Sequence, residues 1–80
     1  MALIASEQIR AGRALLRISV SELSKSAGVG VATIKRIEAM DGLPSANART
    51  LDALVKALES MGIEFLGSPD DAPGLRLRKP

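Results

Sequence analysis

The sequence predicts a mostly α-helical protein, with four short helices and then a β-hairpin in one domain spanning residues 1–80. Through most of residues 6–62, apolar residues recur every three or four positions, which is the spacing of one helix face. Glycine, proline and helix-capping residues divide this pattern into short segments. In residues 63–79 apolar and charged residues alternate at both ends, as they do along a strand with one buried face.

The first two helices are predicted from their capping residues and their apolar spacing. Residues 6–17 form the first helix, with Ser6 as the N-cap, because a serine side chain accepts hydrogen bonds from free amides at a helix start. Ser19 and Glu22 match the Ser-x-x-Glu pattern of a capping box, in which each side chain bonds the other residue's amide. This pattern opens a second helix over residues 20–27.

A glycine and an asparagine delimit the remaining helices. Gly28 directly follows the second helix, at a position where many chains take a left-handed backbone that glycine adopts at little cost. A third helix is expected over residues 31–39, and Asn47 is expected to cap a fourth over residues 48–61. The residues expected to face inward on these last three helices are Leu23, Ala27, Ile34, Ile37, Leu51, Leu54, Val55 and Leu58.

Two alternating segments, residues 63–66 and 75–78, predict the strands of the hairpin. Residues 67–74 contain two proline, two glycine and two aspartate residues and are expected to form a long loop. Because two strands alone are marginally stable in water, we expect the hairpin both to cover the helical core and to contribute to a two-fold dimer. The apolar hairpin residues are Ile63, Phe65, Leu75 and Leu77.

The composition argues against several classes of function. The 80 residues include no cysteine and no histidine, which removes disulfides, the usual zinc ligands and nucleophile–histidine pairs. We therefore expect no enzyme, no catalytic residues, no metal and no cofactor. The apolar runs are too short to span a membrane and the N-terminus lacks a signal-peptide pattern, which predicts a cytoplasmic protein.

Positive charge is concentrated in the first half of the chain. Residues 1–40 carry six Arg or Lys and three acidic residues, whereas residues 41–80 carry five and six, for a net charge of +2. The excess of positive charge therefore coincides with the first three predicted helices.

The second and third helices match helix-turn-helix geometry, in which two short helices meet at a steep angle after a glycine-containing turn. Gly28 supplies the reversal, and small or aliphatic residues occupy the positions where the helices cross. With Ile34 and Ile37 facing inward, the opposite face of the third helix is free to enter the major groove of DNA. Residues 20–38 are therefore predicted to form a helix-turn-helix.

The segment LLRISVSELSKSAGVGVATIKRIE, residues 15–38, resembles the phage-repressor and Cro-type helix-turn-helix proteins of the Xre family. Residues 47–65 and 73–78 resemble the later helix and strands of short bacterial members. The resemblance implies a lambda-repressor-like helical bundle, dimeric binding to inverted DNA repeats, and transcriptional control, commonly repression. The positions that carry it are Arg13, Ser19, Glu22, Leu23, Ala27, Gly28, Val29, Thr33, Ile34, Ile37 and Glu38.

Two positions depart from the family pattern. Family members usually have Gln at the first position of the second helix, where this chain has Val20. They often have Ser or Thr at the cap of the third helix, where it has Gly30. Each replacement removes a polar side chain that would contact DNA. We therefore expect two linked subunits, on half-sites about 34 Å apart, to supply the affinity that one subunit lacks.

The resemblance implies roles for individual residues of the third helix. Arg36 is expected to read a base, preferably guanine, and Lys35 to contact a base or a phosphate. Val31 and Ala32 are expected to read thymine methyl groups or to permit close approach, with core packing as the alternative. The residues expected to contact phosphates are Ser21, Thr33, Asn47 and Arg49.

The remaining charged residues are expected to serve the fold. The resemblance implies a partly buried ion pair between Arg13 and Glu38, which joins the first helix to the end of the third. Arg10 and Arg17 are expected to face solvent, with a phosphate contact as the alternative. The C-terminal basic residues are expected on the wet face of a strand beside Glu64, with a nucleic-acid contact as the alternative. These are Arg76, Arg78 and Lys79.

The sequence thus predicts a transcriptional regulator, most simply a repressor, that binds double-stranded DNA as a homodimer on an inverted repeat. It predicts association with the bacterial nucleoid when bound, and neither membrane contact nor a small-molecule ligand. The alternative is an antitoxin-type module that neutralises a protein partner and autoregulates its promoter; such a protein usually brings an extended partner-binding segment. A helical module without nucleic acid is a third interpretation.

Overall fold

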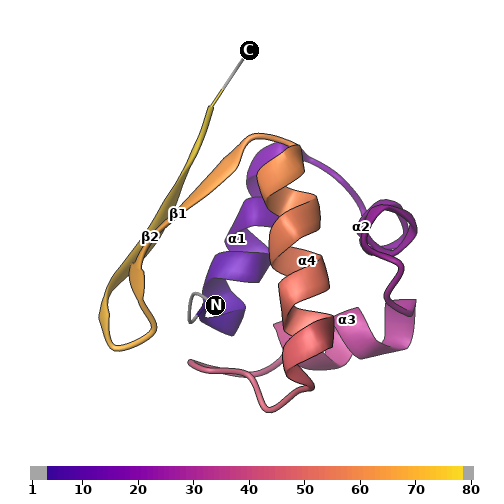
Figure 1. The fold of residues 1–80 in the computed structure, drawn as a ribbon, viewed down its shortest axis with the longest axis horizontal. Helices are drawn as coiled ribbons and strands as arrows, with labels where there is room; N and C mark the ends of the chain where they lie inside the picture. The colour runs from indigo at the N-terminus through magenta and orange to yellow at the C-terminus, as the bar shows by residue number, and fades with distance from the viewer. Residues whose placement is uncertain (1–3, 79–80) are drawn as a thin grey trace.

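Four helices and a two-stranded antiparallel hairpin form the fold, in a computed structural model that describes residues 4–78 (Figure 1). The mostly α-helical prediction is confirmed, and each helix agrees with its predicted bounds to within one residue. None of the helices in residues 4–78 is long and apolar enough to cross a membrane. The elements are α1 (Ser6–Leu16), α2 (Val20–Ala27), α3 (Val31–Glu38), α4 (Ala48–Ser60), β1 (Ile63–Ser68) and β2 (Asp71–Leu77).

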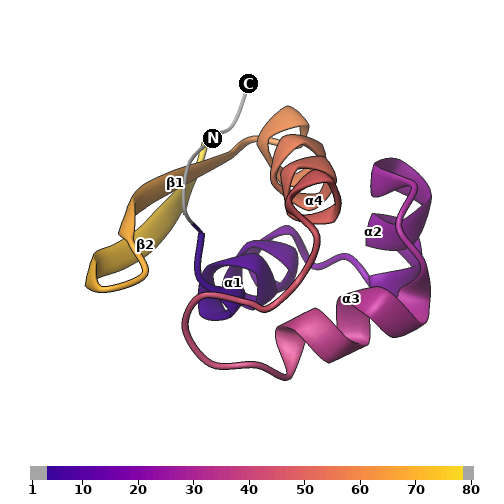
Figure 2. The ribbon, with the colours of Figure 1, turned by 60° about the horizontal axis from the view of Figure 1, so that its bottom comes forward.

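Helices α1 and α4 lie between the hairpin on one side and α2 and α3 on the other (Figures 1 and 2). Strand β2 packs against α1, and β1 packs against α4. On the other side, α2 packs against both α3 and α4, while α3 also contacts α1. The hairpin and the α2–α3 pair therefore occupy opposite sides of the molecule.

The hydrophobic core lies where the helices meet. Leu23, Ile34, Ile37, Leu54 and Leu58 are fully buried, as predicted. Burial of an aliphatic side chain of this size stabilises a fold by about 1.5–3 kcal/mol, so these residues contribute much of the folding free energy. The other residues predicted to face inward pack against this cluster while partly exposed; they are Ala27, Leu51 and Val55.

The predicted cap of α1 is wrong. The N-cap residue is Ala5, whose backbone amide donates to Oε1 of Gln8 at 2.8 Å. Ser6 is instead the first helical residue, and its buried hydroxyl has no hydrogen-bond partner within residues 4–78. A glutamine three residues after the cap therefore satisfies the free amide, as the third position of a capping box does.

The hairpin is tighter than predicted. The strands reach Ser68 and resume at Asp71, so the turn occupies residues 69–70 and the expected loop over residues 67–74 is wrong. The pairing register shifts at Gly67, whose backbone is left-handed with φ of 70°. A Cβ atom there would collide with backbone oxygens of β2, so this bulge requires glycine.

A buried glutamine attaches the hairpin to α1. Gln8 is 3% exposed, and its Nε2 atom donates to the backbone oxygens of Leu66 and Gly74, both at 2.9 Å. Because Leu66 and Gly74 are cross-strand partners, one side chain holds both strands. The hairpin also covers the helical core as expected, through Ile63, which is buried, and the partly buried Phe65, Leu75 and Leu77.

Candidate nucleic-acid interface

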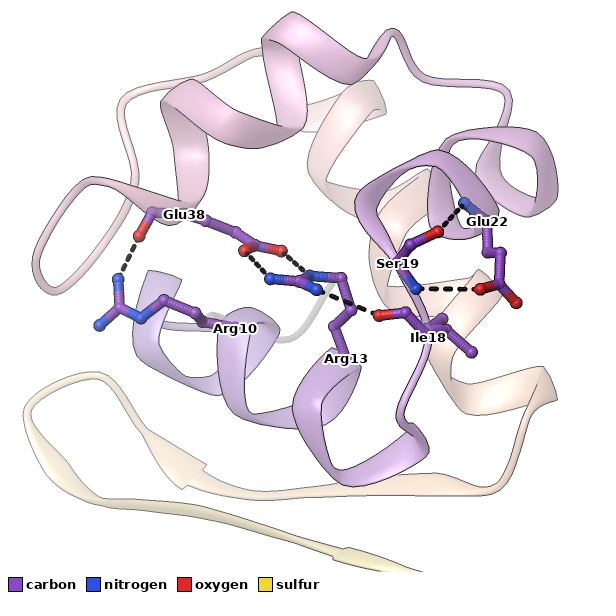
Figure 3. A network of polar contacts seen from close by, with 6 residues as sticks. All are labelled: Arg10, Arg13, Ile18, Ser19, Glu22 and Glu38. Carbon is purple, nitrogen blue, oxygen red and sulfur yellow. Dashed lines mark hydrogen bonds and ion pairs between the residues drawn. The ribbon is translucent and has the colours of Figure 1, made fainter.

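Local hydrogen bonds determine where α2 begins. The amide of Glu22 donates to Ser19 Oγ at 3.0 Å, and the amide of Ser19 donates to Glu22 Oε1 at 3.2 Å (Figure 3). The predicted capping box is therefore confirmed. It satisfies two amides that the first turn of a helix leaves without a backbone partner.

The turn between α2 and α3 consists of Gly28, Val29 and Gly30. Gly28 has the predicted left-handed backbone, with φ of 69°, and its amide donates to the carbonyl of Ser24 at 2.9 Å. The Ser24 hydroxyl also donates to the carbonyl of Val29 at 2.6 Å, a contact that the sequence pattern did not reveal. These bonds define the path of the chain between the two short helices.

Four residues predicted to face DNA form one exposed face of α3. Ala32, Lys35 and Arg36 are exposed, and Val31 is half-buried. Val31 and Ala32 are absent from the apolar side chains that pack against the core, whereas the isoleucines on the opposite side of α3 are fully buried. We call the four residues Val31, Ala32, Lys35 and Arg36 the α3 face.

Unpaired positive charge lies on the α3 face and on the other three helices or their ends. Within residues 4–78, five exposed basic side chains form neither a hydrogen bond nor an ion pair with the rest of that range. Side chains of this kind remain available to the phosphates of a nucleic acid. They come from the end of α1, from α2 and α3, and from the start of α4, and they are Arg17, Lys25, Lys35, Arg36 and Arg49.

The residues predicted to contact phosphates lie at the starts of three helices. Ser21 and Thr33 are in the first turns of α2 and α3; Ser21 is exposed and Thr33 half-buried. Asn47 and Arg49 are exposed at the start of α4, where Asn47 Oδ1 accepts from the Arg49 amide at 2.7 Å and confirms the predicted cap. No other hydrogen bond within residues 4–78 joins these four residues to one another.

An ion pair joins α1 to the last residue of α3 (Figure 3). Arg13 Nε donates to Glu38 Oε2 and Arg13 Nη2 to Glu38 Oε1, both at 2.8 Å, while Nη1 donates to the carbonyl of Ile18 at 3.0 Å. Glu38 is 7% exposed, so the predicted partly buried pair is confirmed. Its hydrogen bond to Glu38 raises the pKa of Arg13 above the ordinary value, although burial opposes this shift.

Arg10 does not simply face solvent, and that prediction is wrong. Its Nη1 atom donates to the backbone oxygen of Glu38 and, at 3.4 Å, to that of Met40 (Figure 3). The last carbonyls of a helix have no partner within the helix, and a cation near them also interacts favourably with the helix dipole. Arg10 and Arg13 lie three residues apart on α1, which is the signal that both reach the same end of α3.

The basic residues of the hairpin are paired on its outer surface. Arg76 Nε and Nη2 each donate to Glu64 at 3.0 Å, and Arg78 also contacts Glu64. These hydrogen bonds, first from Arg76 and then from Arg78, lower the pKa of Glu64 to about 2. The predicted cross-strand pair is confirmed, and Lys79 lies outside the described residues.

Comparison of the chain with known proteins supplies no family. No protein-family model matches the sequence, and no curated protein matches it as a relative. A function is therefore inferred from the residues of the chain and their geometry.

Proposed function

We propose that this protein is a transcriptional regulator that binds specific sequences of double-stranded DNA through a helix-turn-helix formed by α2 and α3. The observation that carries the proposal is the α3 face, where Lys35 and Arg36 are exposed and unpaired. The major groove, about 12 Å wide, admits one α-helix. Arg36 then donates to guanine O6 and N7, and Lys35 contacts a neighbouring base or phosphate.

Electrostatic attraction between the unpaired cations and phosphates also favours DNA as the ligand. Each phosphate neutralised by a lysine or arginine releases condensed counterions, which favours binding and makes it depend on salt. Three of the five unpaired cations, Arg17, Lys25 and Arg49, lie outside α3 and belong to the segments that flank it in sequence or packing. These three cations are suited to contact the phosphates of the DNA while the α3 face reads the bases.

The resemblance to the Xre family suggests how binding becomes regulation. In this proposal the protein occupies an operator, and the bound subunits obstruct transcription from the adjacent promoter. The fraction of operator that is occupied then rises with the concentration of the protein.

A homodimer follows from the proposal, and the hairpin offers its contact surface. Arg78 N donates to Gly62 O at 2.7 Å, and bonded pairs alternate along an antiparallel ladder. Glu64 and Arg76 therefore form the next hydrogen-bonded pair. Ile63 and Leu77 lie between the two pairs, and their backbone N–H and C=O groups point away from the partner strand. Free strand edges of this kind pair readily with a second chain.

The antitoxin-type alternative is less well supported. Such a module usually carries an extended partner-binding segment, whereas residues 63–77 fold back as a hairpin against α1 and α4. The buried side chain of Gln8 binds both strands, which opposes release of this segment to a partner.

Selection of bound sequences from random duplex DNA, at about 50 mM and 200 mM salt, tests the proposal. We expect an inverted-repeat motif and an affinity that falls steeply between the two salt concentrations. The selection uses the purified protein, because it is expected to bind DNA without any other protein. Recovery of no motif at either concentration would contradict the proposed function.

A further inference from the structure

The α3 face combines unpaired charge with apolar side chains that do not pack against the hydrophobic core. Val31 and Ala32 are outside the set of apolar side chains packed against the core, although both lie one turn before the cations Lys35 and Arg36. Burial of apolar surface is the main gain that these two side chains can offer a ligand. A DNA site contacted by this face therefore needs an apolar group next to its hydrogen-bond acceptors.

Gly30 directly precedes these two residues, and the space around it is open. Its backbone, with φ of −61° and ψ of 144°, is open to any residue type, so the turn does not require glycine there. A Cβ atom at this position would meet nothing closer than Thr33 Oγ1, at 3.9 Å. Neither the backbone nor the surrounding atoms therefore require glycine at this position.

One group in the major groove satisfies this requirement. The base edges there present hydrogen-bond donors and acceptors, together with the C5-methyl group of thymine. Methylation of cytosine at C5 places the same group at the same position of the ring. Residues four apart on a helix are about 6 Å apart along its axis, which spans about two base-pair steps of 3.4 Å. The methyl group and the guanine read by Arg36 therefore lie within about two base pairs.

We infer that the α3 face recognises the C5-methyl group of a pyrimidine, so that thymine and 5-methylcytosine are equivalent partners of Val31 and Ala32. This inference rests on the proposed function, because it assigns the DNA chemistry read by the same face. Its consequence is a regulator whose binding strengthens when a cytosine at the contacted position is methylated.

Substitutions that change only the methyl group test the inference. In a duplex that carries the selected site, each thymine is replaced in turn by deoxyuridine, which removes one methyl group and keeps the base pair. We expect a Kd about fourfold higher at one position in each half-site, which corresponds to about 0.8 kcal/mol for one methyl group. At that position, a 5-methylcytosine pair is expected to bind about fourfold more tightly than an unmodified cytosine pair.

Two protein variants show whether α3 is responsible. Val31→Ala removes two methyl groups from the α3 face and is expected to reduce the effect of deoxyuridine to less than about twofold. Leu15→Ala is the matched control, because Leu15 is an apolar residue that is 44% exposed on α1. It is expected to retain the full effect.

The outcomes separate the inference from the proposed function. If the wild-type protein prefers its selected site but binds the thymine and deoxyuridine duplexes equally, the inference is wrong and the proposed function stands. If the methyl effect persists unchanged in Val31→Ala and in Ala32→Gly, the assignment to these residues is wrong. If no duplex is preferred over random DNA, both fail.

Discussion

Arg13 and Glu38 join α1 to the end of α3 through two parallel hydrogen bonds of 2.8 Å. The bonds fix the last residue of the helix whose outer face carries Lys35 and Arg36. Arg10 adds a contact to the backbone oxygen of Glu38, so two arginines of one helix hold the same end of α3. Arg10 and Arg13 therefore hold the helix that carries the proposed DNA-reading surface, and neither arginine needs to contact DNA itself.

Removal of one partner from this pair is expected to destabilise the fold. Arg13→Met leaves the carboxylate of Glu38, with a side chain only 8% exposed, without its counter-charge. We expect a loss of about 3 kcal/mol in the free energy of unfolding, measured by urea denaturation. Arg17→Met removes an equally charged, unpaired arginine nearby and is the control. Equal stability of the two variants would show that the pair contributes nothing.

Replacement of Arg36 is expected to affect binding without affecting stability. Arg36 is exposed and makes no ion pair within residues 4–78, so Arg36→Ala should change the free energy of unfolding by less than about 0.5 kcal/mol. Loss of a bidentate guanine contact should weaken binding to the selected site by about 1–3 kcal/mol and relax specificity at one base pair. Fluorescence anisotropy with duplexes varied at each position measures both effects.

A lysine elsewhere on the surface tests whether the effect of Arg36→Ala on DNA binding depends on the position of the lost charge. Lys56 is exposed on α4 and pairs with Asp52 at 3.0 Å, whereas Arg36 is unpaired within residues 4–78. Lys56→Ala removes one positive charge, as Arg36→Ala does, and is expected to leave sequence preference unchanged. Equal losses in the two variants would indicate a general effect of charge rather than base reading.

Arg49 is expected to contribute to the salt dependence of binding. If it contacts a phosphate, Arg49→Ala should weaken binding to all duplexes alike and reduce the slope of log K against log salt by about 1. Affinities measured at four or more salt concentrations give this slope. A change in sequence preference, with an unaltered slope, would assign Arg49 to the bases instead.

Gln8 is expected to be critical for attachment of the hairpin. Gln8→Leu keeps the burial but removes the two donations to Leu66 and Gly74 and the acceptor for the Ala5 amide. We expect a loss of about 2 kcal/mol, with faster hydrogen exchange at hairpin amides than in α2. Asp71→Asn is the control, because the exposed Asp71 side chain of the same hairpin forms no hydrogen bond or ion pair within residues 4–78. Uniform acceleration throughout the protein would argue against a specific tether.

Acid is expected to weaken the fold through Glu64. Its pKa is lowered from 4.5 to about 2 in the folded protein by hydrogen bonds from Arg76 and Arg78. The folded state therefore binds the proton less readily than the unfolded chain, so the stabilisation is present above pH 4.5 and is lost as the pH falls toward 2. Urea denaturation between pH 5 and pH 2 should show a smaller decline for Glu64→Gln than for the wild type. Parallel curves would contradict this role.

The helices were predictable because their ends are set by neighbouring residues. The Ser19–Glu22 capping box, the left-handed Gly28 and the Asn47 cap each act within a few residues, so the sequence displays them directly. The α3 face was predictable for a similar reason, since the burial of Ile34 and Ile37 determines which side of the helix remains exposed.

The contacts that were missed join residues far apart in sequence. Gln8 binds oxygens 58 and 66 residues away, and Arg10 binds an oxygen 28 residues away, so no local pattern identifies either. The turn of the hairpin was missed for a different reason. Its proline and glycine content is typical of a loop, but the bulge at Gly67 lets the strands continue through it.

The proposed reading surface is tested most directly by an NMR titration of the ¹⁵N-labelled protein with its selected duplex. If the α3 face binds DNA, the amide shifts change most at residues 31–36 and at the starts of α2 and α4, while the hairpin tip at residues 68–71 changes little. Large changes confined to the hairpin, with α3 unaffected, would contradict it.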